Sequence, residues 1–139
     1  MAEFAVIAVL FFMMIFAIIE FGRLLYTHNA LTDAARRGAR YAVLHAEADK
    51  ACVKNVVVYG ETHVDPTTCA PTGPALINGL TTTNITVTYE GIGANAYGPN
   101  LGTVTVSIDF TFTLNIPFAR RTLTMPTYAS TLTAESAGQ

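Results

Sequence analysis

An uninterrupted apolar run near the N-terminus constrains this chain more than any other feature. Between Phe4 and Ile19 the sequence has no charged or polar side chain. As a helix this run would be about 24 Å long, somewhat shorter than the roughly 20 residues that a membrane-spanning helix needs. Extending it to Tyr26 makes a span plausible but includes Glu20. Arg23 is spaced to pair with Glu20 on one helical face, which reduces the cost of an acid near the membrane boundary.

A cleaved secretory signal is the main alternative for this segment. Such signals begin with basic residues, continue with a short apolar region and end with small residues at a cleavage site. Here Glu3 stands at the N-terminal end, and the apolar run is too long and too aromatic for an ordinary signal. We therefore expect the segment to be retained.

The composition reflects this one segment. Of the 139 residues, 51% are apolar and only 13% are charged, whereas a typical domain has about 25% charged residues. The C-terminal half is rich in Thr, Gly and Asn, so the apolar excess lies at the N-terminal end. The length suits one domain. A net charge of -2 gives no basic field for phosphates, so we expect no nucleic-acid partner.

The helical pattern continues past Tyr26 but becomes amphipathic. Small residues at every fourth position predict a close-packing face made of Ala30, Ala34, Gly38, Ala42 and Ala46. Charged residues mark the opposite side, namely Asp33, Arg36, Arg37 and Arg40. Asp33 is spaced to pair with Arg37. The arginines form either a solvated face or a contact with a neighbouring chain or with anionic headgroups.

A break in the helix is expected between Ala46 and Asp49, with a short second helix folding back as far as Val58. Cys52 and Cys69 flank a loop-like stretch. In a chain that leaves the cytoplasm they permit one disulfide, which would contribute roughly 3 kcal/mol by closing the loop. Two unpaired thiols are the alternative.

The hydrophobic period changes to two in the C-terminal half, which predicts half-buried strands. Alternation is clear over 85–90 and over a long run at 104–116, and turn residues at 91–102 predict a hairpin between them. A third run covers 122–135. It changes parity around Pro126, so we expect this proline at a bulge or on an edge.

Together these elements predict an α+β fold. A small antiparallel sheet of about three to four strands would cover its apolar face with the second half of the long helix, and the apolar first half would protrude. Residues 1–26 would form a hydrophobic transmembrane or filament-core segment, and residues 27–139 a periplasmic or extracellular domain. A rod of this kind suits a segment that lies in a membrane first and in a helical bundle afterwards.

Several short motifs carry a family resemblance. They are Glu3-Phe4, the apolar run, Ile-Glu-Phe-Gly-Arg at 19–23, Asn-Ala-Leu at 29–31, and Ala-Ala-Arg at 34–36 leading to Gly-Ala-Arg at 38–40. This pattern resembles the TadE-like family of the tight-adherence pilus systems, within the wider group of type IV pilins. The resemblance is strong up to Tyr41 and diffuse over the rest of the chain.

The resemblance implies a pilin-like inner-membrane precursor. A prepilin-type peptidase would trim it, and the pilus assembly machinery would place it, with copies of itself, in or at the base of a surface filament. Glu3 would neutralise the N-terminal amine of a neighbouring copy. We predict that Glu3, Phe4, Glu20 and Arg23 lie at filament-assembly contacts. The alternative is a single-pass membrane-anchored binding or assembly module that does not polymerise.

The sequence shows no cluster that predicts catalysis. Its three histidines lack the spacing of a zinc site, and there is no phosphate-binding loop or nucleophile motif. Glu61, His63 and Asp65 alternate in one loop, either around a shared cation or as solvated charges. Asn84-Ile-Thr fits a glycosylation sequon, or occurs by chance. We expect no enzymatic activity, no cofactor and no metal.

Overall fold

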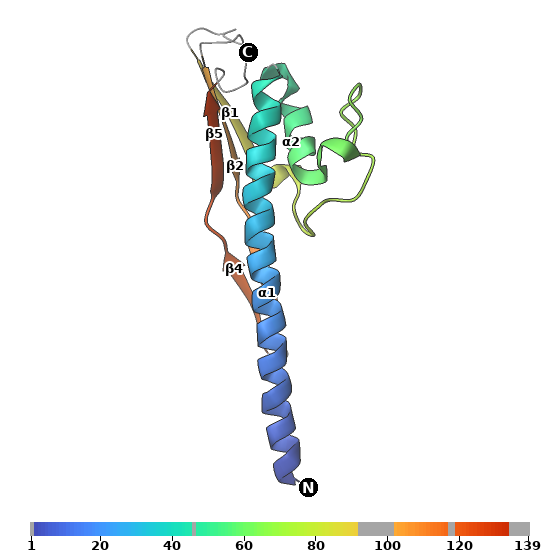
Figure 1. The fold of residues 1–139 in the computed structure, drawn as a ribbon, viewed down its shortest axis with the longest axis vertical. Coiled ribbons are helices and arrows are strands. Elements are labelled where there is room, and N and C mark those ends of the chain that lie inside the picture. Colours follow the sequence, from blue (N-terminus) through green and yellow to red (C-terminus); the bar gives the residue numbers. More distant parts are fainter. Residues whose placement is uncertain (1, 46, 92–101, 117–118, 134–139) are drawn as a thin grey trace.

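The computed structural model describes residues 2–45, 47–91, 102–116 and 119–133. The predicted α+β fold is confirmed. One helix, α1 (Ala2–Val43), runs along almost the whole length of the molecule. The other elements pack beside its C-terminal part, and its N-terminal part protrudes alone, as Figure 1 shows.

The expected helix break and return are also present. After α1 the backbone tightens, with amide hydrogen bonds from Leu44 to Tyr41 and from His45 to Ala42. A 3-10 turn (Glu47–Asp49) leads into α2 (Lys50–Tyr59), which lies beside α1. The helix α2 stops at Gly60, whose φ of 86° is a left-handed conformation that favours glycine. Two further 3-10 turns, Glu61–His63 and Thr82–Asn84, lie in the connection to the strands.

The strands form two antiparallel sheets. The larger sheet has the order β1 (Ile85–Gly91), β2 (Gly102–Ile108) and β5 (Tyr128–Thr133). The smaller sheet is a hairpin of β3 (Thr111–Ile116) and β4 (Ala119–Thr124). Most of the hairpin connection expected at 91–102 lies outside the described residues.

The expected long strand at 104–116 is divided, and this part of the prediction was wrong. Asp109 still faces Asn84 and Thr127 in the register of the larger sheet: its amide donates to the Asn84 carbonyl (2.9 Å) and its carboxylate accepts from the Thr127 hydroxyl (2.6 Å). The pairing with the C-terminal run then shifts by one residue before β3 begins. The run at 122–135 divides opposite this point, between β4 and β5. Three expected strands therefore become five.

The two sheets adjoin at this point, where the register shifts by one residue. On one side two residues, 109–110, separate β2 from β3; on the other side three residues, 125–127, separate β4 from β5. A hydrogen bond from the Met125 amide to the Phe110 carbonyl (3.0 Å) links the two sides. The extra residue on one side is a bulge, and Pro126 lies within it, as the change of parity predicted.

The core lies along the second half of α1, which packs between the larger sheet and α2 (Figure 1). Residues from all three elements are fully buried there: Leu31, Ala39, Val53, Val57, Val106 and Ile108. His28 on α1 also bonds through Nδ1 to the Tyr128 hydroxyl of β5 (2.7 Å). Burial of Tyr128 raises the pKa of that hydroxyl. The packed domain therefore begins near the middle of α1.

Candidate functional site

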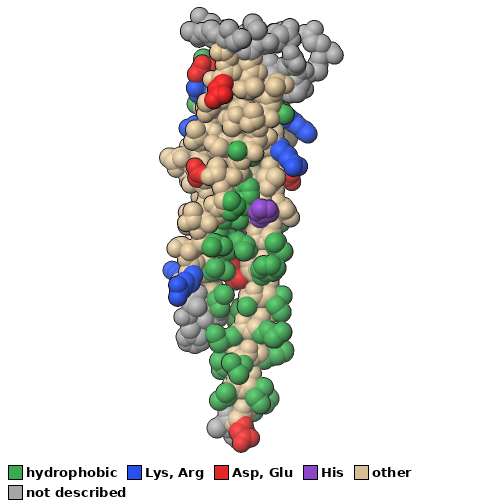
Figure 2. Space-filling view, turned by 90° about the vertical axis from the view of Figure 1, so that its left-hand side faces the viewer, with side chains coloured by type: hydrophobic (Ala, Val, Ile, Leu, Met, Phe, Trp, Pro, Cys, Tyr) green, Lys and Arg blue, Asp and Glu red, His purple; other side chains and the backbone are tan. Residues whose placement is uncertain are grey.

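The protruding half of α1 is an exposed apolar surface. Its large side chains mostly keep about half or more of their surface exposed, and Phe4 reaches 77%. The exposed set in this half consists of Phe4, Val6, Ile7, Val9, Leu10, Phe11, Phe12, Met14, Phe16, Ile18 and Ile19. Figure 2 shows them as an almost continuous green surface on the lower part of the rod.

This helix is long and apolar enough to cross a membrane. The core helix of a soluble protein can have the same composition, but such a helix is buried, and here almost none of the apolar stretch is covered by the rest of the chain. Large contiguous apolar surfaces mark sites that contact a membrane or another protein. The rod is therefore the candidate functional site.

Glu3 and Phe4 lie in the first turn of α1, at the free end of the rod, and both are exposed. A carboxylate at this position interacts favourably with the helix dipole. Neither residue touches the packed domain, so both are available to a molecule outside the chain. Their role in assembly stays a prediction.

Glu20 and Arg23 lie at the other end of the rod and hold it to β3. Glu20 is only 7% exposed. Its Oε1 forms an ion pair with Arg23 Nη1 (3.3 Å) and accepts a hydrogen bond from the Asn115 amide (3.2 Å). Arg23 Nη2 also donates to the Thr113 carbonyl (2.6 Å), and the guanidinium lies 4.6 Å from the centre of the Phe112 ring. The pair that we predicted at subunit contacts thus has partners within its own chain.

The other carboxylate oxygen of Glu20, Oε2, is buried without a hydrogen-bond partner in the described structure. A buried oxygen without a hydrogen bond costs free energy. Loss of the contacts that Oε1 makes with Arg23 or with the Asn115 amide would leave the whole Glu20 carboxylate with still fewer partners. The local arrangement is therefore a tight clamp between α1 and β3, and sequence reasoning missed its β3 side because Asn115 is distant in sequence.

The small-residue face of α1 is largely covered. Ala34, Gly38 and Ala42 are buried, and Ala30 is partly buried. At Gly38 a Cβ atom would collide with the Val57 side chain of α2, so glycine is what lets the two helices approach. A second row, Leu31, Ala35 and Ala39, is equally buried. This row was missed because the helix is covered on two sides, by α2 and by the larger sheet.

The arginines of α1 line an open groove of about 490 Å³ near the far end of the helix. The lining residues are Asp33, Arg36, Arg37, Arg40, Tyr41, Leu44 and Glu61. The expected ion pair between Asp33 and Arg37 is not formed: ion pairs in the described ranges are Glu20–Arg23 and Glu47–Lys50. Arg37 Nε is buried without a hydrogen-bond partner there.

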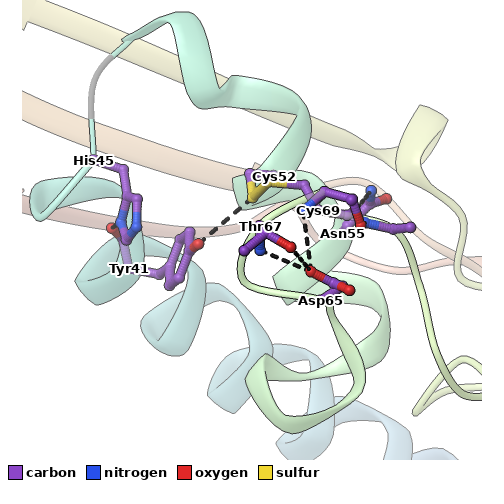
Figure 3. Close-up of a disulfide and its surroundings, with 9 residues drawn as sticks. Tyr41, His45, Cys52, Asn55, Asp65, Thr67 and Cys69 are labelled. Atoms are coloured by element: carbon purple, nitrogen blue, oxygen red, sulfur yellow. Dashed lines mark hydrogen bonds between the residues drawn. A yellow bond between two sulfur atoms is a disulfide. The ribbon is translucent and has the colours of Figure 1, made fainter.

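Cys52 and Cys69 form a disulfide that ties α2 to the following loop (Figure 3). The Tyr41 hydroxyl lies 3.5 Å from Cys52 Sγ, and Asn55 donates to the Cys69 carbonyl (2.8 Å). Burial raises the pKa of the Tyr41 hydroxyl, and the nearby carboxylates of Glu61 and Asp49 raise it further.

Asp65 and His63 make hydrogen bonds within the loop. Asp65 accepts hydrogen bonds from the Thr67 hydroxyl and amide and from the Thr68 amide, which lower its pKa to about 2. His63 Nδ1 lies 3.1 Å from the Thr62 hydroxyl. Among the residues that the structure describes, no three His, Cys, Asp or Glu side chains are placed to hold a metal. Asn84, the sequon residue, accepts from the Thr81 amide and hydroxyl at the entry to β1.

Comparison with known families identifies the part of the chain that contains the rod. Residues 1–40 match the family model described as TadE-like protein. This match covers the exposed rod, the Glu20–Arg23 clamp and most of the small-residue face. Comparisons with curated proteins and with solved structures gave no match.

Residues 1–40 are therefore similar to TadE-like proteins, and the helix to which they belong is long and apolar enough to cross a membrane. The rest of the chain, which includes α2 and both sheets, lies outside the matched residues. The family match therefore gives no information about the fold of these elements.

Proposed function

We propose that this chain is a structural subunit that polymerises through its N-terminal helix into a bacterial surface filament of the tight-adherence, type IV-like kind. The observation that carries the proposal is the exposure of the rod from Phe4 to Ile19. Its bulky side chains are arranged all around the helix, and an isolated copy leaves them uncovered. Lipid covers them before assembly, and neighbouring rods cover them afterwards.

The two environments require different interactions. In the membrane the helix needs only apolar side chains and satisfied backbone groups, which an α-helix provides. In a bundle the helices associate through close packing rather than through escape from water. Glu3 is the group on the rod that distinguishes them, because a charge at the rod end needs a specific partner only in the polymer.

The proposed route follows from this exchange. The chain begins in the inner membrane, a prepilin-type peptidase trims it, and the assembly machinery transfers it to a filament of identical copies outside the cell. We propose a structural role without catalysis. Whether the subunit is principal or minor determines only how much of the filament it forms.

The test combines imaging with matched variants. Electron microscopy of sheared surface material should show filaments that contain this chain, and mass spectrometry of the same material gives its N-terminus. Glu3→Gln should reduce filaments at least about tenfold if a charged pair worth roughly 1.4 kcal/mol is lost at each contact. Glu90→Gln, at an exposed acid of β1, is the control and should leave filaments unchanged.

The alternative is an anchored module that does not polymerise. A tether requires only apolar character, so it should tolerate Glu3→Gln, remain a monomer in detergent and leave no filaments. Glu20→Ala is a poorer test than Glu3→Gln, because Glu20 also binds β3 within its own chain. Membrane association with no filaments in the wild type would favour the tether.

A further inference from the structure

The hairpin of β3 and β4 lies beside the end of the exposed rod. Phe112 and Thr113 contact Arg23, and Asn115 contacts Glu20. As β3 advances, its partners on α1 move toward the helix N-terminus. The strand therefore runs antiparallel to α1, and its last residue, Ile116, lies toward the N-terminal half of α1. In Figure 1, β4 lies beside the middle of α1, nearer the protruding rod than the larger sheet does.

Two arginines stand on the hairpin at the height of the clamp. Arg120 pairs with Asn115 in the ladder, and Arg121 pairs with Leu114. Both side chains are exposed, and within the described part of the chain neither has an ion pair or hydrogen bond. The segment 111–124 contains no acid, so its charge is uncompensated. Figure 2 shows basic side chains gathered beside the apolar rod.

The backbone of the hairpin fixes where a bilayer surface must lie. Among the strands that the structure describes, β4 pairs with β3 alone, so the other edge of β4 has no strand partner there for its amide and carbonyl groups. Such an edge cannot lie in hydrocarbon. On the hairpin side, the hydrocarbon must therefore end near Glu20. The apolar run to Ile19 is about 24 Å long, less than the 30 Å of a typical hydrocarbon core, and this mismatch draws the headgroups toward the hairpin.

We propose that Arg120 and Arg121 bind the anionic headgroups of the leaflet that faces the sheet domain, and so seat the domain on the membrane before assembly. The proposal rests on the membrane stage of the proposed function. Guanidinium groups suit this ligand because they bind phosphate oxygens through two parallel hydrogen bonds, and basic residues next to a membrane helix are attracted by anionic lipids.

The arginines of the α1 groove provide a matched comparison. Arg36 follows Glu20 by 16 residues along α1, a rise of about 24 Å. The headgroup layer extends only about 5–8 Å beyond the hydrocarbon. For a helix along the bilayer normal, Arg36 and Arg40 are therefore out of reach of lipid, although both are exposed. Of these two pairs of arginines, the hairpin pair lies at the height of the headgroups. Arg23 lies at the same height, but it is already bound to Glu20 and to the Thr113 carbonyl.

A tryptophan reporter tests the proposal, because the chain contains no Trp. The full chain carrying Thr122→Trp, at an exposed position beside Arg121, is reconstituted into vesicles of phosphatidylcholine, or of phosphatidylcholine and phosphatidylglycerol in equal parts. A trace of lipid with a spin-labelled headgroup quenches the reporter. Thr88→Trp, exposed on β1, reports on the distant part of the domain.

We expect the anionic lipid to increase quenching of the residue-122 reporter roughly twofold or more, and high salt to reverse the increase. Arg120→Gln with Arg121→Gln should abolish the increase, Arg36→Gln with Arg40→Gln should preserve it, and the residue-88 reporter should not respond. Equal quenching in both lipids, or an increase that survives Arg120→Gln with Arg121→Gln, overturns the proposal. So does shielding of the reporter that depends on protein concentration, which would assign the arginines to a second copy.

Flotation of every variant with vesicles separates this proposal from the one on which it rests. If all variants float but quenching of the reporter does not depend on lipid charge, Arg120 and Arg121 do not bind anionic headgroups, and the chain still inserts into the membrane. If the wild type does not float, the chain does not insert into the membrane, and the proposed binding of the two arginines to headgroups is wrong as well. Near-ultraviolet circular dichroism of the arginine variants verifies that the hairpin remains folded.

Discussion

The two halves of α1 share one helical backbone but have opposite surfaces. From Phe4 to Ile19 the side chains are mostly large and exposed; from Leu31 to Val43 the inward side chains are mostly small and buried. Hydrophobicity alone would predict the reverse. Burial in this chain depends on which partner is present. Small residues let α2 and the sheet approach closely, whereas the bulky residues are left largely uncovered by the described part of the chain.

A new charge should separate the two halves most strongly. Ala39→Arg places an unpaired cation at a fully buried position and should destabilise the packed domain by at least about 4 kcal/mol. Leu10→Arg should leave the domain within about 0.5 kcal/mol of wild type but weaken membrane insertion, by about 2.5–3.5 kcal/mol near the bilayer centre. Urea unfolding in detergent and vesicle flotation measure the two effects. Equal loss of domain stability in both variants would contradict the comparison.

Loss of the disulfide should affect only the packed half. Cys52 and Cys69 are 17 residues apart, so replacing both with serine should lower the unfolding free energy by about 3 kcal/mol. Reductant added to the wild type should produce the same midpoint shift in urea. Flotation should not change, and a loss of flotation on reduction would show that the rod depends on the domain.

The two glycines described in α1 give a smaller and more direct comparison. Gly38→Ala should destabilise the domain by about 1–3 kcal/mol, because its Cβ would collide with Val57. Gly22→Ala meets no atom within 4 Å and should be neutral or stabilise the helix by up to about 1 kcal/mol. Thermal unfolding of both variants in the same detergent decides the sign. A destabilising Gly22→Ala would place an unseen contact on the exposed half.

The smallest effect on stability is expected from Asp65, in the loop that follows α2, when the pH is lowered. Asp65 has its pKa lowered to about 2, from an ordinary value of 3.8, by hydrogen bonds from Thr67 and Thr68. A lowered folded-state pKa stabilises the fold above pH 4, and this contribution is lost as the pH falls toward 2. Asp65→Asn should flatten that part of the profile of stability against pH. An identical acid profile in Asp65→Asn and wild type would exclude this contribution.

The sequence predicted the elements whose signals are local. The length and polarity of the apolar run predicted the rod, and the spacing of small residues predicted a packed second half. The break between β2 and β3 gave no such signal: the buried and exposed side chains continue to alternate through Asp109 and Phe110. The division comes from a one-residue shift in the pairing with the C-terminal run, between the β2–β5 and β3–β4 registers, which only the folded chain sets.

The candidate site was predicted in the same uneven way. The residues of the rod could be named from sequence, and Glu20 and Arg23 could be paired by their spacing. Their contacts with β3 could not be found, because Asn115 lies 95 residues from Glu20 and nothing in the local sequence marks it. The sequence likewise contained no sign of where Arg120 and Arg121 lie along α1, which follows from the register of β3 and β4.

The unbroken course of α1 from Ala2 to Val43 has a geometric consequence for any array of these molecules. One inserted residue between the halves would rotate the rod by about 100° relative to the sheet and lift it by 1.5 Å. The direction in which each sheet faces is therefore fixed by the rotation of its rod about the helix axis. A lattice built from the rods would transmit one orientation to every outer domain.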